Sequence, residues 1–211
     1  MKKLSVILPF CLIFTNLLAQ NATINTIGSD STIRSKIIIV HFDNSLGTIF
    51  PAEYAQILFG DNINWRNKTF ITLDSALIKK IDITFIQQYC IANLDFMNYK
   101  WNLDKAYLLD NVSKIEYRKA KRFHKNQLKL LEKFCPQRQK DIAFKFKQYL
   151  GFMNEKGERV IYIQLINFKD DQYNLISHFT KDWIDGFGEW FESNTEKFYY
   201  NIDNDRLSIN E

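Results

Sequence analysis

The chain has 211 residues, of which 46% are hydrophobic and 25% are charged, a composition typical of globular rather than disordered proteins. The formal net charge is +4, and removal of Lys2 and Lys3 with a leader peptide would leave about +2. A balance so close to neutral argues against general binding of nucleic acid.

The first 19 residues have the pattern of a secretory signal peptide. Lys2 and Lys3 precede an apolar run over 4–14, and the small residue Ala19 stands at the expected cleavage site. The run is shorter than the roughly 20 apolar residues that span a bilayer, and no later run reaches that length. We therefore expect export to the periplasm, the cell envelope or the medium, and a mature chain without a transmembrane span.

Residues 20–35 are polar and predict a flexible leader, followed by a single domain over 36–211. Within this domain we expect a buried strand over 36–42, a short helix over 51–59 and a strand over 69–73. Asp74 is then the expected N-cap of a helix over 75–92, because its carboxylate can accept hydrogen bonds from exposed backbone amides. One face of this helix is apolar, at spacings of three and four residues: Leu77, Ile78, Ile81, Phe85, Ile86 and Tyr89.

A second helix is predicted over 114–134. Ser113 and Glu116 have the spacing of a capping box, and Pro136 is expected to stop the helix. Its apolar residues, expected to form a buried stripe, are Ile115, Phe123, Leu130, Leu131 and Phe134.

The pattern changes to β-strands from residue 142 onward. Alternating residues over 142–153 and a β-rich run over 160–168 flank a glycine-containing turn, which predicts a hairpin. We expect another strand over 182–192 and a final hairpin of 197–202 with 206–210. The predicted fold class is α+β, with an antiparallel sheet, mainly C-terminal, packed against two or more helices.

The segment 148–163 resembles a hairpin of small exported proteins of Bacteroidota-type bacteria. Further matches to that family's pattern are Asp185-Gly186, Trp190-Phe191 and Ser208-Ile209-Asn210, whereas Gln164, Phe187 and Glu211 depart from it. The resemblance covers about 65 residues and its motifs are structural. Because those proteins are uncharacterised, it implies a fold and a compartment but no reaction.

The mature chain would keep two cysteines, Cys90 and Cys135. In an oxidising compartment two thiols favour a disulfide, which would stabilise the fold by about 4 kcal/mol on the loop-entropy model. Two separate buried thiols are the alternative reading.

The segment 114–147 is strongly basic, with twelve Lys or Arg residues against three acidic ones. It is a candidate site for an anionic envelope component or a protein partner, and a solvated helix face is the structural alternative. The candidate binding residues are Arg118, Lys121, Arg122, Lys125 and Lys129.

Residues able to perform catalysis are sparse and carry no complete motif. His41 and Asp43 form a conceivable His–Asp dyad, and Asp185 and Glu189 a conceivable carboxylate pair. No metal motif and no cofactor fingerprint is present. We therefore expect an exported, non-catalytic binding or assembly module. The alternative is a small envelope hydrolase that uses these carboxylates or the His–Asp pair.

Overall fold

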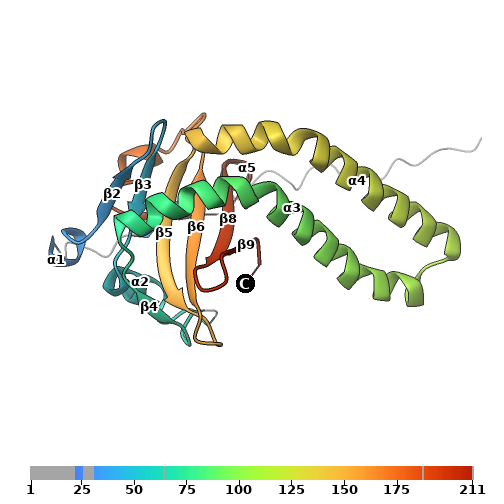
Figure 1. Cartoon of the computed structure of the whole chain (residues 1–211), viewed down its shortest axis with the longest axis horizontal. Helices are drawn as coiled ribbons and strands as arrows, with labels where there is room; N and C mark the ends of the chain where they lie inside the picture. The colour runs from blue at the N-terminus through green and yellow to red at the C-terminus, as the bar shows by residue number, and fades with distance from the viewer. Residues whose placement is uncertain (1–21, 26–30, 64, 187, 211) are drawn as a thin grey trace, which may run out of the picture.

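The computed structural model of the chain describes residues 22–25, 31–63, 65–186 and 188–210. The predicted signal peptide, residues 1–19, lies outside the described residues. A seven-stranded sheet lies against helices in the described part, which confirms the α+β class and the mainly C-terminal sheet (Figure 1). No helix in the described ranges is both long and apolar enough to cross a membrane.

The seven-stranded sheet has the strand order β2-β3-β5-β6-β8-β9, and β4 pairs with β5. Neighbouring strands are antiparallel except β3 and β5, so the sheet is mixed rather than purely antiparallel. The hairpins predicted around 154–157 and 203–205 are confirmed as β5–β6 and β8–β9. The strand bounds are β2 Ile38–His41, β3 Leu46–Ile49, β4 Thr69–Ile71, β5 Phe146–Met153, β6 Arg159–Ile166, β8 Thr195–Asn201 and β9 Arg206–Ser208.

Two parts of the predicted leader have regular structure. Strand β1 (Ala22–Asn25) pairs with β7 (Trp183–Gly186) in a separate two-stranded sheet, and α1 (Ser31–Arg34) follows it. The Arg34 guanidinium reaches the buried Asp182 carboxylate at 2.8 Å. Residues before the first predicted strand therefore contact the domain.

The sheet buries side chains on both faces. The N-terminal half of the long helix α3 (Ser75–Asn111) covers one face, and α2 (Ala52–Phe59) packs on the other. Seven of the eight residues of β6 are buried, as expected of a strand that is covered on both sides. A third cluster packs around Phe179, Ile184 and Phe191.

The sequence predicted a strand over 182–192, and the structure corrects this. After β7 the chain turns into the helix α5 (Glu189–Asn194), which contains Trp190 and Phe191. Both neighbouring aromatic residues are buried in the same cluster, whereas a half-buried strand would send them to opposite faces. Short 3-10 turns occupy Ile142–Phe144, before β5, and Leu175–Ser177.

The two long helices begin where the capping residues predicted. The Asp74 side chain accepts from the Leu77 amide at the start of α3, and Ser113 and Glu116 form a reciprocal capping box at the start of α4 (Lys114–Asp141). Both helices are longer than predicted. Pro136 lies inside α4 on its exposed side and does not end the helix.

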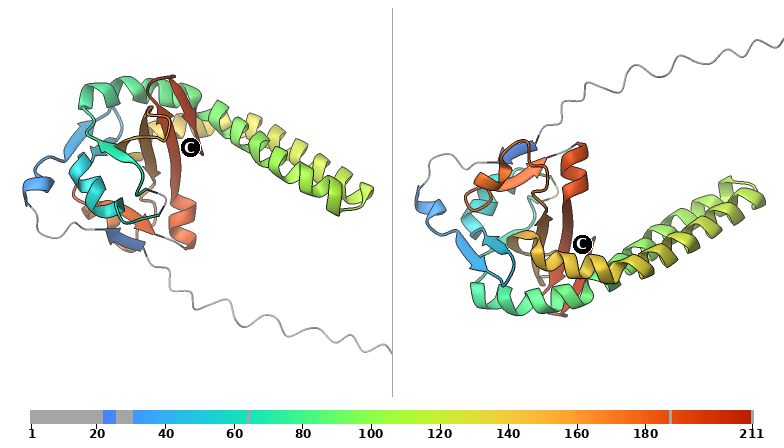
Figure 2. Two further views of the ribbon diagram at one scale, coloured as in Figure 1. Left: turned by 90° about the horizontal axis from the view of Figure 1, so that it is seen from below. Right: turned by 90° about the horizontal axis from the view of Figure 1, so that it is seen from above.

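The distal halves of α3 and α4 extend beyond the sheet as a two-helix projection (Figure 2). We call residues 93–134, which include the turn between the helices, the arm. No residue of this segment is buried in the structure. The arm therefore has helix–helix contacts but no third layer against which to build a core.

Candidate functional site

The basic residues predicted to bind a partner lie on the arm. Arg118, Lys121, Arg122, Lys125 and Lys129 are all exposed on α4. They recur at intervals of three and four residues, so they gather on one side of the helix. The opposite side of α4 faces α3, where His124 stacks on Trp101 with ring centroids 4.8 Å apart. The helix pairing therefore leaves the basic side in solvent.

These five cations differ from the basic residues near the sheet. Arg138 and Lys145 both pair with Glu196, and Lys147 pairs with Asp82 at 3.0 Å. In the described ranges none of the five arm cations forms an ion pair. Arg138, Lys145 and Lys147 thus have acidic partners, whereas the five cations on the arm form no ion pair in the described residues.

The prediction that the apolar stripe of the second helix is buried is wrong. Ile115, Phe123, Leu130 and Phe134 are exposed, and only Leu131 packs against the core. The sheet ends before it could cover these residues, so their spacing of eight, seven and four residues forms a surface stripe instead. The arm consequently presents apolar as well as basic side chains to solvent.

Cys90 and Cys135 meet where the arm leaves the sheet. The structure places Cys90 and Cys135 as a disulfide, with Cα atoms 5.7 Å apart, a separation that suits a bridge. Cys90 lies one turn beyond Ile86 on α3, and the Gln139 side chain of α4 donates to the Ile86 carbonyl. The bridge and this hydrogen bond join both helices at the base of the arm.

The candidate dyad residues His41 and Asp43 line one cavity. They stand at the β2–β3 turn, and the cavity has a volume of about 390 Å³. Its other polar lining residues are Asn44 of the turn and Lys79 and Asp82 of α3. In the structure described, no hydrogen bond joins His41 to Asp43, and the lining contains no Ser, Thr or Cys side chain. The cavity thus brings the two residues together without a nucleophile beside them.

Asp82 connects this cavity to a buried cluster that the sequence did not reveal. Its carboxylate is 11% exposed and lies 3.0 Å from the ammonium of Lys147, which is fully buried and sits 4.6 Å from the Phe42 ring. The Tyr149 hydroxyl, beside this pair, is buried without a hydrogen-bond partner. Burial, with a contribution from the Asp82 charge, raises the pKa of Tyr149 well above its usual value.

Lys147 escaped prediction because alternation with apolar residues in a strand normally indicates a solvent-facing side chain. Here that face of β5 lies under α3, where Asp82 receives the charge. The sequence offered one signal for this pair. It is a lysine in the middle of a strand that is buried on both faces, together with an isolated Asp on an amphipathic helix.

Asp185 and Glu189 lie away from His41 and Asp43. Asp185 is on β7 and pairs with Lys197 at 3.4 Å, and Glu189 is exposed in the first turn of α5. Neither lines the cavity that contains the His–Asp pair. The four candidate catalytic residues are therefore divided between two regions. No cluster of three or more His, Cys, Asp or Glu suited to a metal ion occurs among the described residues.

Comparison with known proteins adds no identity. No family, curated protein or solved structure matches this chain. The arm with its base disulfide and the cavity at the β2–β3 turn are the candidate sites of this chain.

Proposed function

We propose that the protein is an exported, non-catalytic binding module, and that the basic side of α4 engages an anionic component of the cell envelope. The observation that carries the proposal is the contrast between the paired cations near the sheet and the five unpaired cations of the arm. Export is supported by the signal-peptide pattern of residues 1–19 and by the placement of Cys90 and Cys135 as a disulfide.

The position of the cations favours binding over simple solubility. An arm that projects from the domain places its charges far from the acidic residues of the sheet (Figure 1). At physiological ionic strength charges are screened over about 8 Å, so acids on the domain contribute little at the arm. Neighbouring cations one helical turn apart are within this distance and attract an anionic surface together.

The binding function is better supported than hydrolysis. The cavity lined by His41 and Asp43 offers no side-chain nucleophile, and Asp185 and Glu189 lie elsewhere. The arm, in contrast, carries cations that favour an anionic partner. Binding of such a partner requires no reaction.

The proposal is tested with two polyanions and two matched variants. The arm variant changes Arg118, Lys121, Arg122, Lys125 and Lys129 to Gln. The body variant removes the same charge by changing five exposed cations outside the arm to Gln: Arg66, Lys79, Lys80, Lys169 and Lys181. The probes are vesicles of phosphatidylglycerol in phosphatidylcholine, compared with phosphatidylcholine alone, and soluble poly-L-glutamate.

We expect the wild type to bind at least one polyanion at low salt. Near an anionic membrane surface each Lys or Arg contributes about 1 kcal/mol, and a tenfold change in affinity requires about 1.4 kcal/mol. The arm variant should therefore bind at least about tenfold more weakly, and the body variant should stay within about twofold of the wild type. Absence of binding to both polyanions, or equal weakening in the two variants, would overturn the proposal.

A further inference from the structure

The apolar side of α3 that covers the sheet continues past the last strand. Ile78, Ile81, Phe85, Tyr89 and Ala92 are buried against the sheet at steps of three and four residues. The same steps lead on to Phe96, Tyr99, Leu103 and Tyr107, which lie on the arm. The exposed fraction rises along this series from 2% at Ala92 to 47% at Tyr99, 59% at Leu103 and 66% at Tyr107.

The overhanging part of this stripe has the length needed to cover additional strands. From Phe96 to Tyr107 the helix rises about 17 Å, whereas neighbouring strands are about 4.8 Å apart. The overhang thus corresponds to about three strands beyond β9. In the described residues the second half of this stripe is therefore a bare apolar helix face beside the edge of the sheet.

The sheet ends beneath the overhang in an edge that is only partly capped. The side-chain amide of Gln88, on α3, donates to the Asp205 carbonyl at 2.8 Å and accepts from the Leu207 amide at 2.7 Å. One residue of a parallel neighbouring strand would make the same two bonds through its own amide and carbonyl. The Leu207 carbonyl lies at the same edge as the Leu207 amide, because both groups of one residue point to the same side of a strand, and in the described chain β9 has no strand partner other than β8. Ile209 follows the end of β9, and a strand continued to it would turn its amide to this edge as well.

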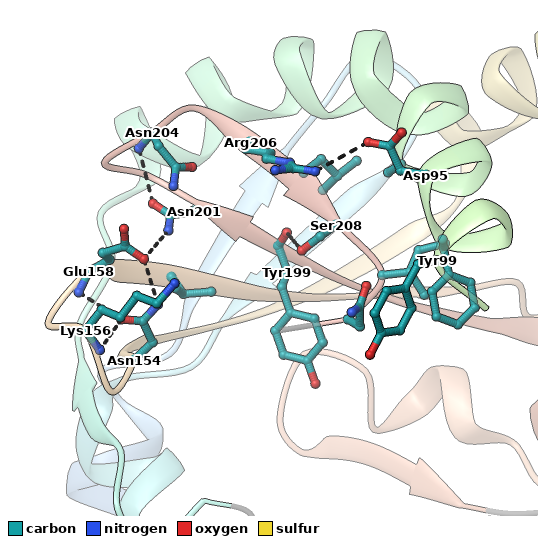
Figure 3. A pocket seen from close by; sticks show the side chains of 16 residues that line it. Asp95, Tyr99, Asn154, Lys156, Glu158, Tyr199, Asn201, Asn204, Arg206 and Ser208 are labelled. Atoms are coloured by element: carbon teal, nitrogen blue, oxygen red, sulfur yellow. Dashed lines mark hydrogen bonds and ion pairs between the residues drawn. The ribbon is translucent and has the colours of Figure 1, made fainter. Parts of the chain in front are cut away.

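A groove of about 340 Å³ follows this edge (Figure 3). One wall is the overhang, with Asp95, Phe96 and Tyr99, and the Arg206 guanidinium lies 3.5 Å from the Asp95 carboxylate across the upper rim. The floor is β9 with Ile209 and Asn210. The other wall contains Tyr199 and the β5–β6 turn. The groove therefore combines a backbone edge with apolar and aromatic side chains on either side.

We propose that this groove binds an extended segment of another protein, which adds as a strand to the edge of β9 beneath the α3 overhang. Backbone pairing with the edge would provide affinity, and apolar side chains at alternate positions would contact Phe96, Tyr99 and Leu103. The Gln88 amide already occupies the Asp205 carbonyl and the Leu207 amide, so the added strand would pair from the Leu207 carbonyl onward. This site is separate from the basic side of α4 and does not depend on the function proposed for it.

A second copy of the chain is the less favourable occupant. Pairing of two β9 edges would bring two arms together, and each arm carries five cations without ion pairs in the described residues. Like charges brought close together oppose association. An extended segment of a different protein avoids this repulsion.

The test selects binders from a phage-displayed library of random dodecapeptides on the immobilised full chain. Selected peptides are then measured by titration against three variants whose folding is verified by circular dichroism. Leu103→Glu places a charge on the overhang, and Ile209→Pro removes the amide that would continue the edge past β9. Leu109→Glu is the matched control, because Leu109 is 56% exposed on the same helix but points about 120° away from Leu103.

We expect a family of peptides with apolar residues at alternate positions. Their affinity should fall at least about tenfold in Leu103→Glu and in Ile209→Pro and stay within about twofold in Leu109→Glu. The proposal is overturned if no family is enriched, or if binding withstands Leu103→Glu. It is likewise overturned if sedimentation equilibrium finds a dimer that Ile209→Pro dissociates, since the edge would then belong to a second copy.

Discussion

Cys90 of α3 and Cys135 of α4 lie 5.7 Å apart at their Cα atoms and join the two helices where the arm leaves the sheet. They are 45 residues apart in sequence, so the bridge closes a loop that contains the entire arm. The location suggests that the disulfide fixes how the arm is attached rather than how it folds at its tip.

We expect the double variant Cys90→Ser/Cys135→Ser to lose about 4 kcal/mol of unfolding free energy, because the unfolded chain regains the entropy of an open loop. Urea denaturation of the oxidised wild type and the variant measures this difference, and alkylation counts the free thiols. Alkylation of both cysteines in the unreduced native protein would show that the bridge is absent.

The buried pair of Lys147 and Asp82 predicts an asymmetric response to mutation. Asp82→Asn leaves the fully buried Lys147 ammonium without its carboxylate, which should cost about 3–5 kcal/mol. Lys147→Met should cost less, because Asp82 borders the cavity at the β2–β3 turn and water can reach it. Urea denaturation of both variants checks the order, and equal losses would contradict the described burial.

Acid stability should depend on Glu196. Burial opposes ionisation of this carboxyl, but Lys145, the Tyr89 hydroxyl and Arg138 outweigh burial and hold its pKa below the usual 4.5. A lowered pKa in the folded state stabilises the protein above pH 4.5, and this contribution is lost as the pH falls through the folded value.

Glu196→Gln should therefore destabilise the protein most near neutral pH, and the difference from the wild type should shrink below pH 4.5. Thermal unfolding of both proteins between pH 7 and pH 3 measures this difference. A difference that stays constant over the whole range would show that the carboxyl has no lowered pKa.

The two halves of α3 should differ in hydrogen exchange. Residues 78–92 pack on the sheet, whereas the arm has no buried residue in the structure. Helical segments of this length are marginal in water without tertiary packing, so backbone amides over 96–111 should exchange at least about a hundredfold faster than those over 78–92. Uniform protection along α3 would mean that the paired arm helices are stable by themselves.

The sequence predicted the parts of this fold that depend on local chemistry. The Asp74 cap, the Ser113–Glu116 capping box and the two C-terminal hairpins all rest on contacts within a few residues of each other. The class of the fold follows from the same periodicities. These features can be derived from a single chain because the interacting groups are neighbours in sequence.

The features that escaped prediction depend on distant residues. A helical stripe has the same spacing whether it lies on a sheet, as at Phe85, or in solvent, as at Phe123. Whether a strand lysine is solvated or buried likewise depends on the helix above it, as Lys147 shows with Asp82. The candidate binding residues were found from the sequence. Their lack of ion-pair partners, which distinguishes them from the paired cations near the sheet, could come only from the structure.

Hydrogen exchange of the full chain with and without a polyanion tests the central claim most directly, because it locates the bound surface. With phosphatidylglycerol vesicles or poly-L-glutamate present, whichever binds, peptides covering 114–133 should gain protection while those of β6 remain unchanged. The arm variant should show no gain under the same conditions. Protection confined to the sheet, with 114–133 unaffected, would contradict the assignment of the arm as the binding element.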